Sequence, residues 1–349
     1  MPADRPRIGF IGAGSIGSIV GGLMAEAGHD VTLVDQWPEH VDAIKRSGLR
    51  LSGSVGERTV KVPALHLHEL QSVGEPFDIV FVCVKSYDTE WSAQLMLPYA
   101  GPGAVFVSLQ NCLNDERLAG VVGRERTLGT VTTISTGLYE PGHAQRTDSL
   151  TSGKHVTGSL DGRDTPELRQ VVEILGDAGT SQQTDDLMRE RWAKFVGNCG
   201  ANAVVGISGY GTVEMIRTPM TRRVMIHATA EAVRVARALG QQPGPAYSVD
   251  PDLYVDASEG RRVEEAESAL LAYADKSQNT GVASFGQDVL KGRRTEIDYL
   301  NGYISQKGRE TGVPTPVSDA ITGIIHSQPT GKFQPDPALL EPVQRLTEG

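Results

Sequence analysis

Three polar residues, Lys194, Asn198 and Asn202, recur at four-residue spacing in a stretch that is otherwise small and apolar. In an α-helix such positions share one face, so one ammonium and two carboxamides would form a row. Lysine can donate a proton, and each amide can donate and accept hydrogen bonds. A solvated helix face is the alternative, but no charged residue occurs from Phe195 to Tyr210. We therefore predict that the row faces a cleft, holds a polar carbonyl compound and delivers a proton to it.

A glycine-rich turn near the start of the chain predicts the second reactant. It follows the short apolar strand Arg7–Ile11 and precedes an amphipathic helix to about Gly28 and a strand from Val31 to Asp35. Strand, glycine turn, helix and strand in this order are typical of dinucleotide-binding domains. The first glycine permits the tight turn, the second lets a pyrophosphate approach, and the third lets helix and strand pack closely, while exposed amides bind the phosphates. The turn consists of Gly12, Ala13, Gly14, Ser15, Ile16 and Gly17.

Asp35 predicts the choice of cofactor. It closes the second strand, where a carboxylate accepts hydrogen bonds from the adenosine ribose and repels a 2'-phosphate. Residues 36–40 contain no arginine or lysine, so the sequence favours NAD over NADP. NADP stays open as the alternative, because Arg46 and Arg50 could reach a phosphate if their loops fold back.

The domains that must position these groups follow from the hydrophobic pattern. Two further buried strands, 77–84 and 104–109, lead into Lys85 and Asn111, and ligands of doubly wound sheets collect at such carboxyl ends. Added strands at 126–135 and 155–160 and a helix at 165–177 complete the first domain, and residues 180–186 are interpreted as a linker. We predict a dinucleotide-binding α/β domain at 1–184, an all-helical domain at 185–329 and a C-terminal tail at 330–349. Within the helical domain, residues 241–260 resemble a loop or lid.

Composition excludes several function classes. The 349 residues favour two domains, and a net charge of -10 argues against nucleic-acid and anionic-membrane partners. No apolar run approaches the roughly 20 residues of a membrane span, and the N-terminus lacks the layout of a secretion signal, so a cytoplasmic protein is expected. The three cysteines predict neither a disulfide framework nor a metal site, and we expect no metal at His66 and His68 either.

Taken together, these motifs resemble the ketopantoate reductase family over almost the whole chain, from about residue 7 to residue 325. No motif is specific alone, but their order and spacing are. The blocks are Gly12–Gly17, Val84-Lys85, Gln110-Asn111, Lys194-x3-Asn198-x3-Asn202, Ser284-x2-Gln287-Asp288 and Thr295-Glu296-Ile297-Asp298-x2-Asn301-Gly302.

The resemblance implies a Rossmann domain joined to a helical domain of the 6-phosphogluconate dehydrogenase C-terminal type, with the active site in the cleft between them. The implied reaction interconverts a small 2-oxo acid, 2-dehydropantoate or a relative, and a 2-hydroxy acid. It implies Lys194 as general acid, with Glu296 near the lysine and the nicotinamide. Asn198, Asn202 and Ser284 would bind the substrate, and Lys85 and Asn111 the cofactor. Helical domains of such enzymes often mediate dimers, so a homodimer is a further expectation.

Four departures from the family pattern leave the substrate open. Cys112 replaces the glycine of Gln-Asn-Gly, Phe285 a frequent methionine, and Thr212 an asparagine, while Asp35 opposes the family's usual NADP preference. Two other functions stay open. A β-hydroxyacid dehydrogenase would share the architecture, but its glycine-rich substrate loop is not visible, and a non-catalytic NAD sensor would not need Lys194 and Glu296.

Overall fold

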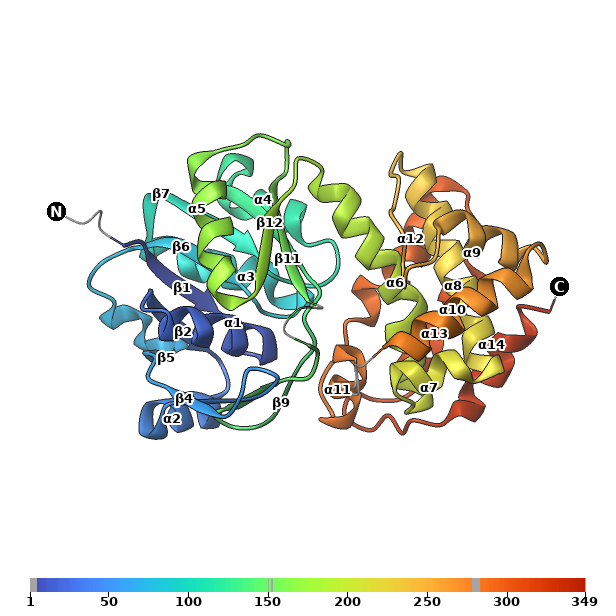
Figure 1. Cartoon of the computed structure of the whole chain (residues 1–349), viewed down its shortest axis with the longest axis horizontal. Coiled ribbons are helices and arrows are strands. Elements are labelled where there is room, and N and C mark those ends of the chain that lie inside the picture. Colours follow the sequence, from blue (N-terminus) through green and yellow to red (C-terminus); the bar gives the residue numbers. More distant parts are fainter. Residues whose placement is uncertain (1–4, 150, 152, 278–282, 349) are drawn as a thin grey trace. The chain divides into compact units, whose positions relative to one another are not determined.

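The structure is a computed structural model that describes residues 5–149, 151, 153–277 and 283–348. The chain forms two compact units, unit 1 (Met1–Leu187) and unit 2 (Met188–Gly349) (Figure 1). Residues 1–4, on which the expectation about a secretion signal partly depends, lie outside the described residues. Among the helices of the described ranges, none is long and apolar enough to cross a membrane.

Unit 1 is built on an eight-stranded sheet with the order β12-β11-β8-β7-β6-β1-β2-β5. β1 lies between β2 and β6 and is parallel to both. The only antiparallel pair of this sheet in the described residues is β8 with β11. The strands are β1 (Arg7–Ile11), β2 (Asp30–Asp35), β5 (Ala64–His66), β6 (Phe77–Val82), β7 (Ala100–Ser108), β8 (Thr127–Thr132), β11 (Lys154–Ser159) and β12 (Thr180–Gln183).

Apolar side chains point to both faces of this sheet, which explains why helices must cover both. Along β1, Ile8 and Phe10 belong to one buried core, whereas Ile11 belongs to another. Side chains alternate between the faces of a strand, so a strand that is apolar throughout needs cover on each side. The helices of unit 1 are α1 (Ser15–Glu26), α2 (Pro38–Ser47), α3 (Thr89–Met96), α4 (Asp115–Val122) and α5 (Pro166–Leu175), with short 3-10 turns η1 (Leu67–Ser72), η2 (Ser86–Asp88), η3 (Leu97–Tyr99), η4 (Arg124–Arg126) and η5 (Gly176–Ala178).

A second sheet, of four strands in the order β4-β3-β10-β9, was not expected from the sequence. β3 pairs in parallel with β10, although more than 80 residues separate them in the chain. Such short strands show little alternation, so the partner decides their conformation. They are β3 (Leu49–Gly53), β4 (Arg58–Val60), β9 (Thr136–Glu140) and β10 (His143–Arg146).

The interpretation of residues 180–186 as a linker was wrong for their first half. Thr180–Gln183 is β12, which pairs in parallel with β11 from Lys154↔Thr180 to Thr157↔Gln183. The strand lies at the edge of the sheet and is largely exposed, so polar residues are tolerated along it. Its sequence therefore lacks the apolar alternation by which a half-buried strand is recognised.

Unit 2 is helical in its described residues, apart from an isolated bridge between Ala246 and Val249. This agrees with the predicted helical second domain. Its helices are α6 (Leu187–Ser208), α7 (Thr212–Arg217), α8 (Pro219–Ala238), α9 (Pro251–Ser258), α10 (Val263–Lys276), α11 (Ser284–Leu290), α12 (Asn301–Thr311), α13 (Pro316–His326) and α14 (Glu341–Arg345), with 3-10 turns η6 (Ile297–Tyr299) and η7 (Pro337–Leu340).

Two segments of unit 2 contain more packed structure than the sequence indicated. Residues 241–260 are not only a loop or lid, because they contain α9, whose first turn is capped by the side chain of Asp250. The segment after residue 330 ends in the short helix α14 and packs on the rest of the unit. Its Leu340 and Val343 are fully buried, and the N–H of Asp336 donates to the carbonyl of Ile207 at 2.8 Å. Both segments carry polar and proline-rich sequence. α9 packs on its chain neighbours α8 and α10, whereas the C-terminal segment bonds to Ile207, which is distant in the chain.

Glu231 ties α8 to the start of α13 and predicts a pH dependence of stability. Its two carboxyl oxygens accept the N–H groups of Val317 and Ser318, each at 2.8 Å. Burial raises its pKa from 4.5 to about 7, so between these values the folded chain holds a proton that the unfolded chain releases. The stabilisation by Glu231 is therefore complete below pH 4.5 and is lost as the pH rises through 7.

We expect the difference in unfolding free energy between wild type and Glu231→Gln to fall by about 2–3 kcal/mol as the pH rises from 4.5 to above 7. Urea titrations at several pH values measure it. Glu341→Gln, at an exposed carboxyl in the first turn of α14, is the control and should show no comparable trend. A difference between wild type and Glu231→Gln that does not change with pH would contradict the prediction.

Candidate active site

The predicted polar row lies on one continuous helix. α6 runs from Leu187 to Ser208 and contains Lys194, Asn198 and Asn202, so the helix prediction is confirmed. Lys194 and Asn198 are half-buried, and Asn202 is only 8% exposed. A row of amides and an ammonium at this depth is partly shielded from water, which strengthens its electrostatic interactions with a bound group.

The other faces of α6 are fixed by close packing. A Cβ atom at Gly200 would overlap Thr229 of α8, so only glycine lets these two helices approach so closely. Toward α12, Trp192 and Phe195 meet Tyr303 in a cluster of rings, with the Phe195 and Tyr303 centroids 5.7 Å apart. The polar row therefore stands on a helix held on at least two sides.

The motif that contains Glu296 is joined to α6 by a buried hydrogen bond. The Nδ2 of Asn301, at the start of α12, donates to the carbonyl of Cys199 at 2.9 Å. Cys199 lies between Asn198 and Asn202, so Asn301 anchors the motif at the middle of the polar row. Glu296 is 5% exposed and directly precedes η6. Sequence reasoning quoted Asn301 only as part of a pattern, and its structural role was missed.

The motif that contains Ser284 packs on the same helix. Ser284 is the first residue of α11 and is half-buried. The ring of Phe285 fills the space above Gly206 of α6, where any added Cβ atom would collide with it. Gly206 is one turn beyond Asn202, so unit 2 gathers the sequence motifs of residues 194–202, 284 and 296 around α6. Thr212, the first residue of α7, is also half-buried.

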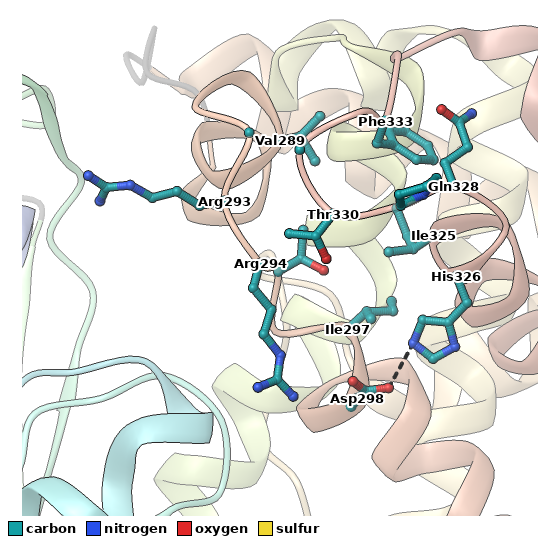
Figure 2. A pocket seen from close by; sticks show the side chains of 14 residues that line it. Val289, Arg293, Arg294, Ile297, Asp298, Ile325, His326, Gln328, Thr330 and Phe333 are labelled. Atoms are coloured by element: carbon teal, nitrogen blue, oxygen red, sulfur yellow. Dashed lines mark ion pairs between the residues drawn. The ribbon is translucent and has the colours of Figure 1, made fainter.

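A cavity of about 450 Å³ lies behind the Glu296 segment within unit 2 (Figure 2). Thr295 and Ile297 line it on one side and residues 325–333 on the other. In Figure 2, Arg293 points away from the cavity, and His326 forms an ion pair with Asp298 at 2.9 Å. The described residues that line the cavity include none of those predicted to bind the substrate. We therefore do not assign the substrate to it.

In unit 1, the three glycines of the turn have different physical reasons. Gly12 has φ +98, and a Cβ atom there would lie 2.8 Å from the backbone of Cys83, so the turn requires glycine. Gly17 lies against the carbonyl oxygen of Gly12, which any Cβ atom would overlap. Gly14 differs from both, because its φ is -64 and no other atom lies within 4 Å of an added Cβ. Nothing in the described chain requires glycine at position 14, whereas the approach of a ligand would.

Asp35 closes β2 beside this turn, and its carboxylate is held by two backbone groups. Oδ2 accepts the N–H of Ala13 at 2.6 Å, and Oδ1 accepts the N–H of Trp37 at 2.8 Å. Of the two arginines that could have favoured a phosphate, Arg50 forms an ion pair with Glu57 at 3.2 Å, and Arg46 lies in the last turn of α2. A fixed carboxylate therefore stands at the end of β2.

The loops that carry Lys85 and Asn111 follow the carboxyl ends of β6 and β7, as predicted, and are tied to one another. The Nε2 of Gln110 donates to the carbonyl of Val84 at 2.9 Å. The Nδ2 of Asn114 donates to the carbonyl of Asn111 at 2.8 Å and to Ser86 Oγ at 2.9 Å. Gln110 and Asn114 are thus positioning residues that fix the two loops. Only the place of Asn114 directly before a helix could have indicated it.

Comparison with known proteins identifies the family. The model of "Ketopantoate reductase PanE/ApbA" matches residues 8–162, and that of its C-terminal part matches residues 186–328. The chain belongs to the ketopantoate reductase family. It is 32% identical to the 2-dehydropantoate 2-reductase of Archaeoglobus fulgidus over 93% of this chain and 98% of the relative. It is 30% identical to the Halobacterium salinarum enzyme of the same name, over 91% of this chain and 97% of the relative.

Solved structures show the same architecture. A PanE/ApbA family ketopantoate reductase from Ralstonia eutropha matches with a TM-score of 0.74 and 27% identity, over 98% of this chain and 100% of that one. D-mandelate dehydrogenase, solved with NADH and anilino(oxo)acetate, matches with a TM-score of 0.76 over 98% and 100%. At 22% identity the latter comparison concerns the fold alone. The family and fold predicted from the motifs are confirmed: this chain is a nicotinamide-dependent oxidoreductase that acts on CH–OH groups.

Cys112, which replaces the family's glycine, retains the backbone shape of glycine. Its φ is 64, in the left-handed region, and its side chain is 5% exposed. This conformation costs a residue with a Cβ atom about 1 kcal/mol. We therefore expect the free energy of unfolding, measured in urea, to be about 1 kcal/mol higher for Cys112→Gly than for Cys112→Ala. Elsewhere alanine is usually the more stable of the two. The control is Cys199 within α6, where Ala should be the more stable replacement by about the same amount.

Proposed function

We propose that this chain interconverts a small 2-oxo acid and the corresponding 2-hydroxy acid with NAD(H), and that Lys194 is the general acid and base. The observation that carries the proposal is the arrangement of unit 2. One partly buried helix face carries Lys194, Asn198 and Asn202, and the segments with Ser284 and Glu296 are fastened to that same helix. An ammonium, two amides and a hydroxyl are the groups that a keto acid needs.

The proposed proton chemistry follows from the charges of the reaction. The cofactor, when bound, supplies a hydride, and its addition to a ketone builds negative charge on the oxygen. The Lys194 ammonium would stabilise that charge and supply the proton. A lysine pKa is ordinarily about 10.4, so the group is charged at neutral pH. The buried carboxyl of Glu296 would favour the charged form of a neighbouring lysine, whereas burial opposes it.

The substrate contacts are proposed from hydrogen-bonding capacity. Asn198 and Asn202 present donors and acceptors beside the lysine, and Ser284 offers a hydroxyl to the carboxylate. The ring of Phe285, in α11, packs against Gly206 of α6, and Thr212 is shorter than the family's asparagine. Both replacements lie in the unit that carries the proposed substrate groups, so we propose the class of substrate, a small 2-oxo acid, and leave its side chain to experiment.

The glycine turn and Asp35 support NAD as the cofactor. Open space at Gly14 suits the approach of a pyrophosphate, and the first turn of α1 lacks a side-chain cap among the described residues. Lys85 and Asn111 follow strands of the same sheet and are proposed as further contacts. The fixed carboxylate of Asp35 would accept the ribose hydroxyls and repel a 2'-phosphate.

The test is turnover of a panel of 2-oxo acids, including 2-dehydropantoate and an aromatic member, with NADH and NADPH. We follow the absorbance of the reduced nicotinamide. Oxidation of NADH with at least one 2-oxo acid supports the proposal. If the panel is silent while NADH binds, the sensor hypothesis gains. A second assay with NAD and 3-hydroxy acids tests the other alternative, and reduction of NAD by these acids alone would favour a β-hydroxyacid dehydrogenase. Faster use of NADPH would contradict the role of Asp35.

Replacing Asp35 with asparagine is expected to weaken the preference for NADH. Asparagine keeps one acceptor oxygen for the backbone N–H groups and removes the charge that repels a 2'-phosphate. We expect the ratio of kcat/KM for NADH over NADPH to fall about tenfold, a change of about 1.4 kcal/mol. Asp30→Asn, at the other and exposed end of β2, is the control and should leave the ratio unchanged. An unchanged ratio in Asp35→Asn would show that another group selects the cofactor.

A further inference from the structure

A buried serine and a buried histidine brace the glycine turn from behind. The Oγ of Ser18, in α1, donates to the carbonyl of Ala13 at 2.7 Å, and it lies 3.2 Å from Nε2 of His40, in α2. Both side chains are fully buried. Neither residue belongs to the glycine motif, and neither has a place in the function proposed above.

The hydrogen bonds fix the tautomer of His40. The N–H of Gly142, in the turn between β9 and β10, donates to Nδ1 at 2.8 Å. Nδ1 must therefore be the unprotonated nitrogen, so Nε2 carries the hydrogen and donates it to Ser18. Ser18 in turn uses its own hydrogen for Ala13. All donors point one way, from Gly142 through His40 and Ser18 to the carbonyl of Ala13.

The far end of this chain of donors is itself held in place. Gly142 has φ +77, and a Cβ atom there would lie 2.8 Å from Ala43 of α2. Its carbonyl accepts the N–H of Arg50 in β3 at 2.9 Å. The four-stranded sheet thus holds Gly142, and through it His40, in place. This gives a role to a sheet that is separate from the eight-stranded sheet of the dinucleotide fold.

The near end acts on the peptide that would meet a phosphate. In a trans peptide the C=O and the following N–H point in opposite directions. Ser18 holds the carbonyl of Ala13, so it also sets the direction of the N–H of Gly14. The carboxylate of Asp35 accepts the N–H of Ala13 at 2.6 Å and also accepts the N–H of Trp37. The Trp37 ring stacks on the His40 ring, with their centroids 5.5 Å apart. Both peptide groups of Ala13 are therefore fixed by side chains.

We propose that Ser18 and His40 are positioning residues for the cofactor, which preorganise the glycine turn so that the N–H of Gly14 is directed at the pyrophosphate. The inference rests on the proposed function, since it requires a dinucleotide at this turn. A preorganised amide binds an anion without first losing conformational freedom. Removing the brace should therefore weaken cofactor binding while leaving the groups on α6 untouched.

The test uses variants that cut the brace at different links. Ser18→Ala removes the bond to Ala13. His40→Asn keeps an oxygen near Nδ1 for Gly142 but loses the donor to Ser18, whereas His40→Gln keeps an amide donor near Nε2 and loses the acceptor. The control is Ser159→Ala, because the Oγ of the buried Ser159, in β11, donates to the carbonyl of Arg163 at 2.8 Å and neither residue belongs to this chain of donors.

NADH fluorescence titration gives Kd, and thermal unfolding of the same samples gives Tm. We expect Kd to rise about three- to tenfold in Ser18→Ala and in His40→Asn, with no further rise in the double variant. His40→Gln should bind NADH within about twofold of wild type, and so should Ser159→Ala. If His40→Asn fails to fold, Ser18→Ala decides alone.

The outcomes separate this inference from the proposed function. A wild type that binds neither NADH nor NADPH overturns both. A wild type that binds NADH, with Ser18→Ala binding equally well, overturns the brace and leaves the proposed function standing. A fall in Tm without a change in Kd would show that Ser18 and His40 only stabilise the fold, and it also overturns the proposal.

Discussion

Lys194→Ala is expected to lower kcat about a thousandfold for any 2-oxo acid that the wild type reduces. The variant loses both the proton donor and the charge that stabilises the developing oxyanion. Each effect is worth a factor of about 10² or more, and the two overlap because one ammonium supplies both. The Kd for NADH should stay within about twofold, since the glycine turn, Asp35, Lys85 and Asn111, which are proposed to hold the rest of the cofactor, lie in unit 1. Stopped-flow or steady-state oxidation of NADH, together with fluorescence titration, measures both quantities.

Two further variants make this result specific. Lys194→Arg keeps a positive charge but cannot donate a proton near neutral pH, because the pKa of a guanidinium lies far above that of an ammonium. We therefore expect it to restore only a small part of the rate. Lys332→Ala removes an exposed lysine of the same unit and should match wild type. If Lys194→Ala keeps more than about a tenth of the wild-type kcat, another group is the acid.

Gly14→Ala is expected to weaken cofactor binding with little loss of stability, whereas Gly17→Ala is expected to lower the stability of the fold. At Gly14 the added methyl group meets no other atom of the described chain and φ is -64, so the unfolding free energy should change by less than about 1 kcal/mol. The same methyl group would occupy the space of the pyrophosphate, and we expect the Kd for NADH to rise at least about tenfold, or about 1.4 kcal/mol.

At Gly17 the methyl group would overlap the carbonyl oxygen of Gly12, a backbone atom that cannot rotate away. We expect Gly17→Ala to lose about 1–3 kcal/mol of stability. Urea titration gives the free energy of unfolding of each variant, and NADH titration gives its Kd. Unchanged NADH binding by a folded Gly14→Ala protein would place the pyrophosphate elsewhere.

Much of the site could be predicted because its signals are local. Gly12 must have a positive φ directly after an apolar strand, and Lys194, Asn198 and Asn202 share a helix face through a spacing of four. Both follow from the geometry of neighbouring residues, so they are visible in any one sequence. The order of the motifs then predicted the family, which the comparisons confirmed.

Other features depend on partners far away in the chain. Thr180–Gln183 is a strand because β11 offers it a free edge, and Leu340 is buried although its segment is rich in proline and polar residues. Asn301 and Cys199 are 102 residues apart, and so are His40 and Gly142. A hydrogen bond of this kind leaves no periodic trace in the sequence, since each residue alone is compatible with many environments.

The sequence by itself therefore determined the fold class, the family, the glycine turn and the row on α6, because these require only local backbone geometry and side-chain spacing. Only the tertiary structure decided which residues support them. It showed that Asn301 and Phe285 fasten the Glu296 and Ser284 segments to α6, and that Ser18 and His40 stand behind the turn. The physical reason is that such support comes from packing and hydrogen bonds between segments that meet only when the chain has folded.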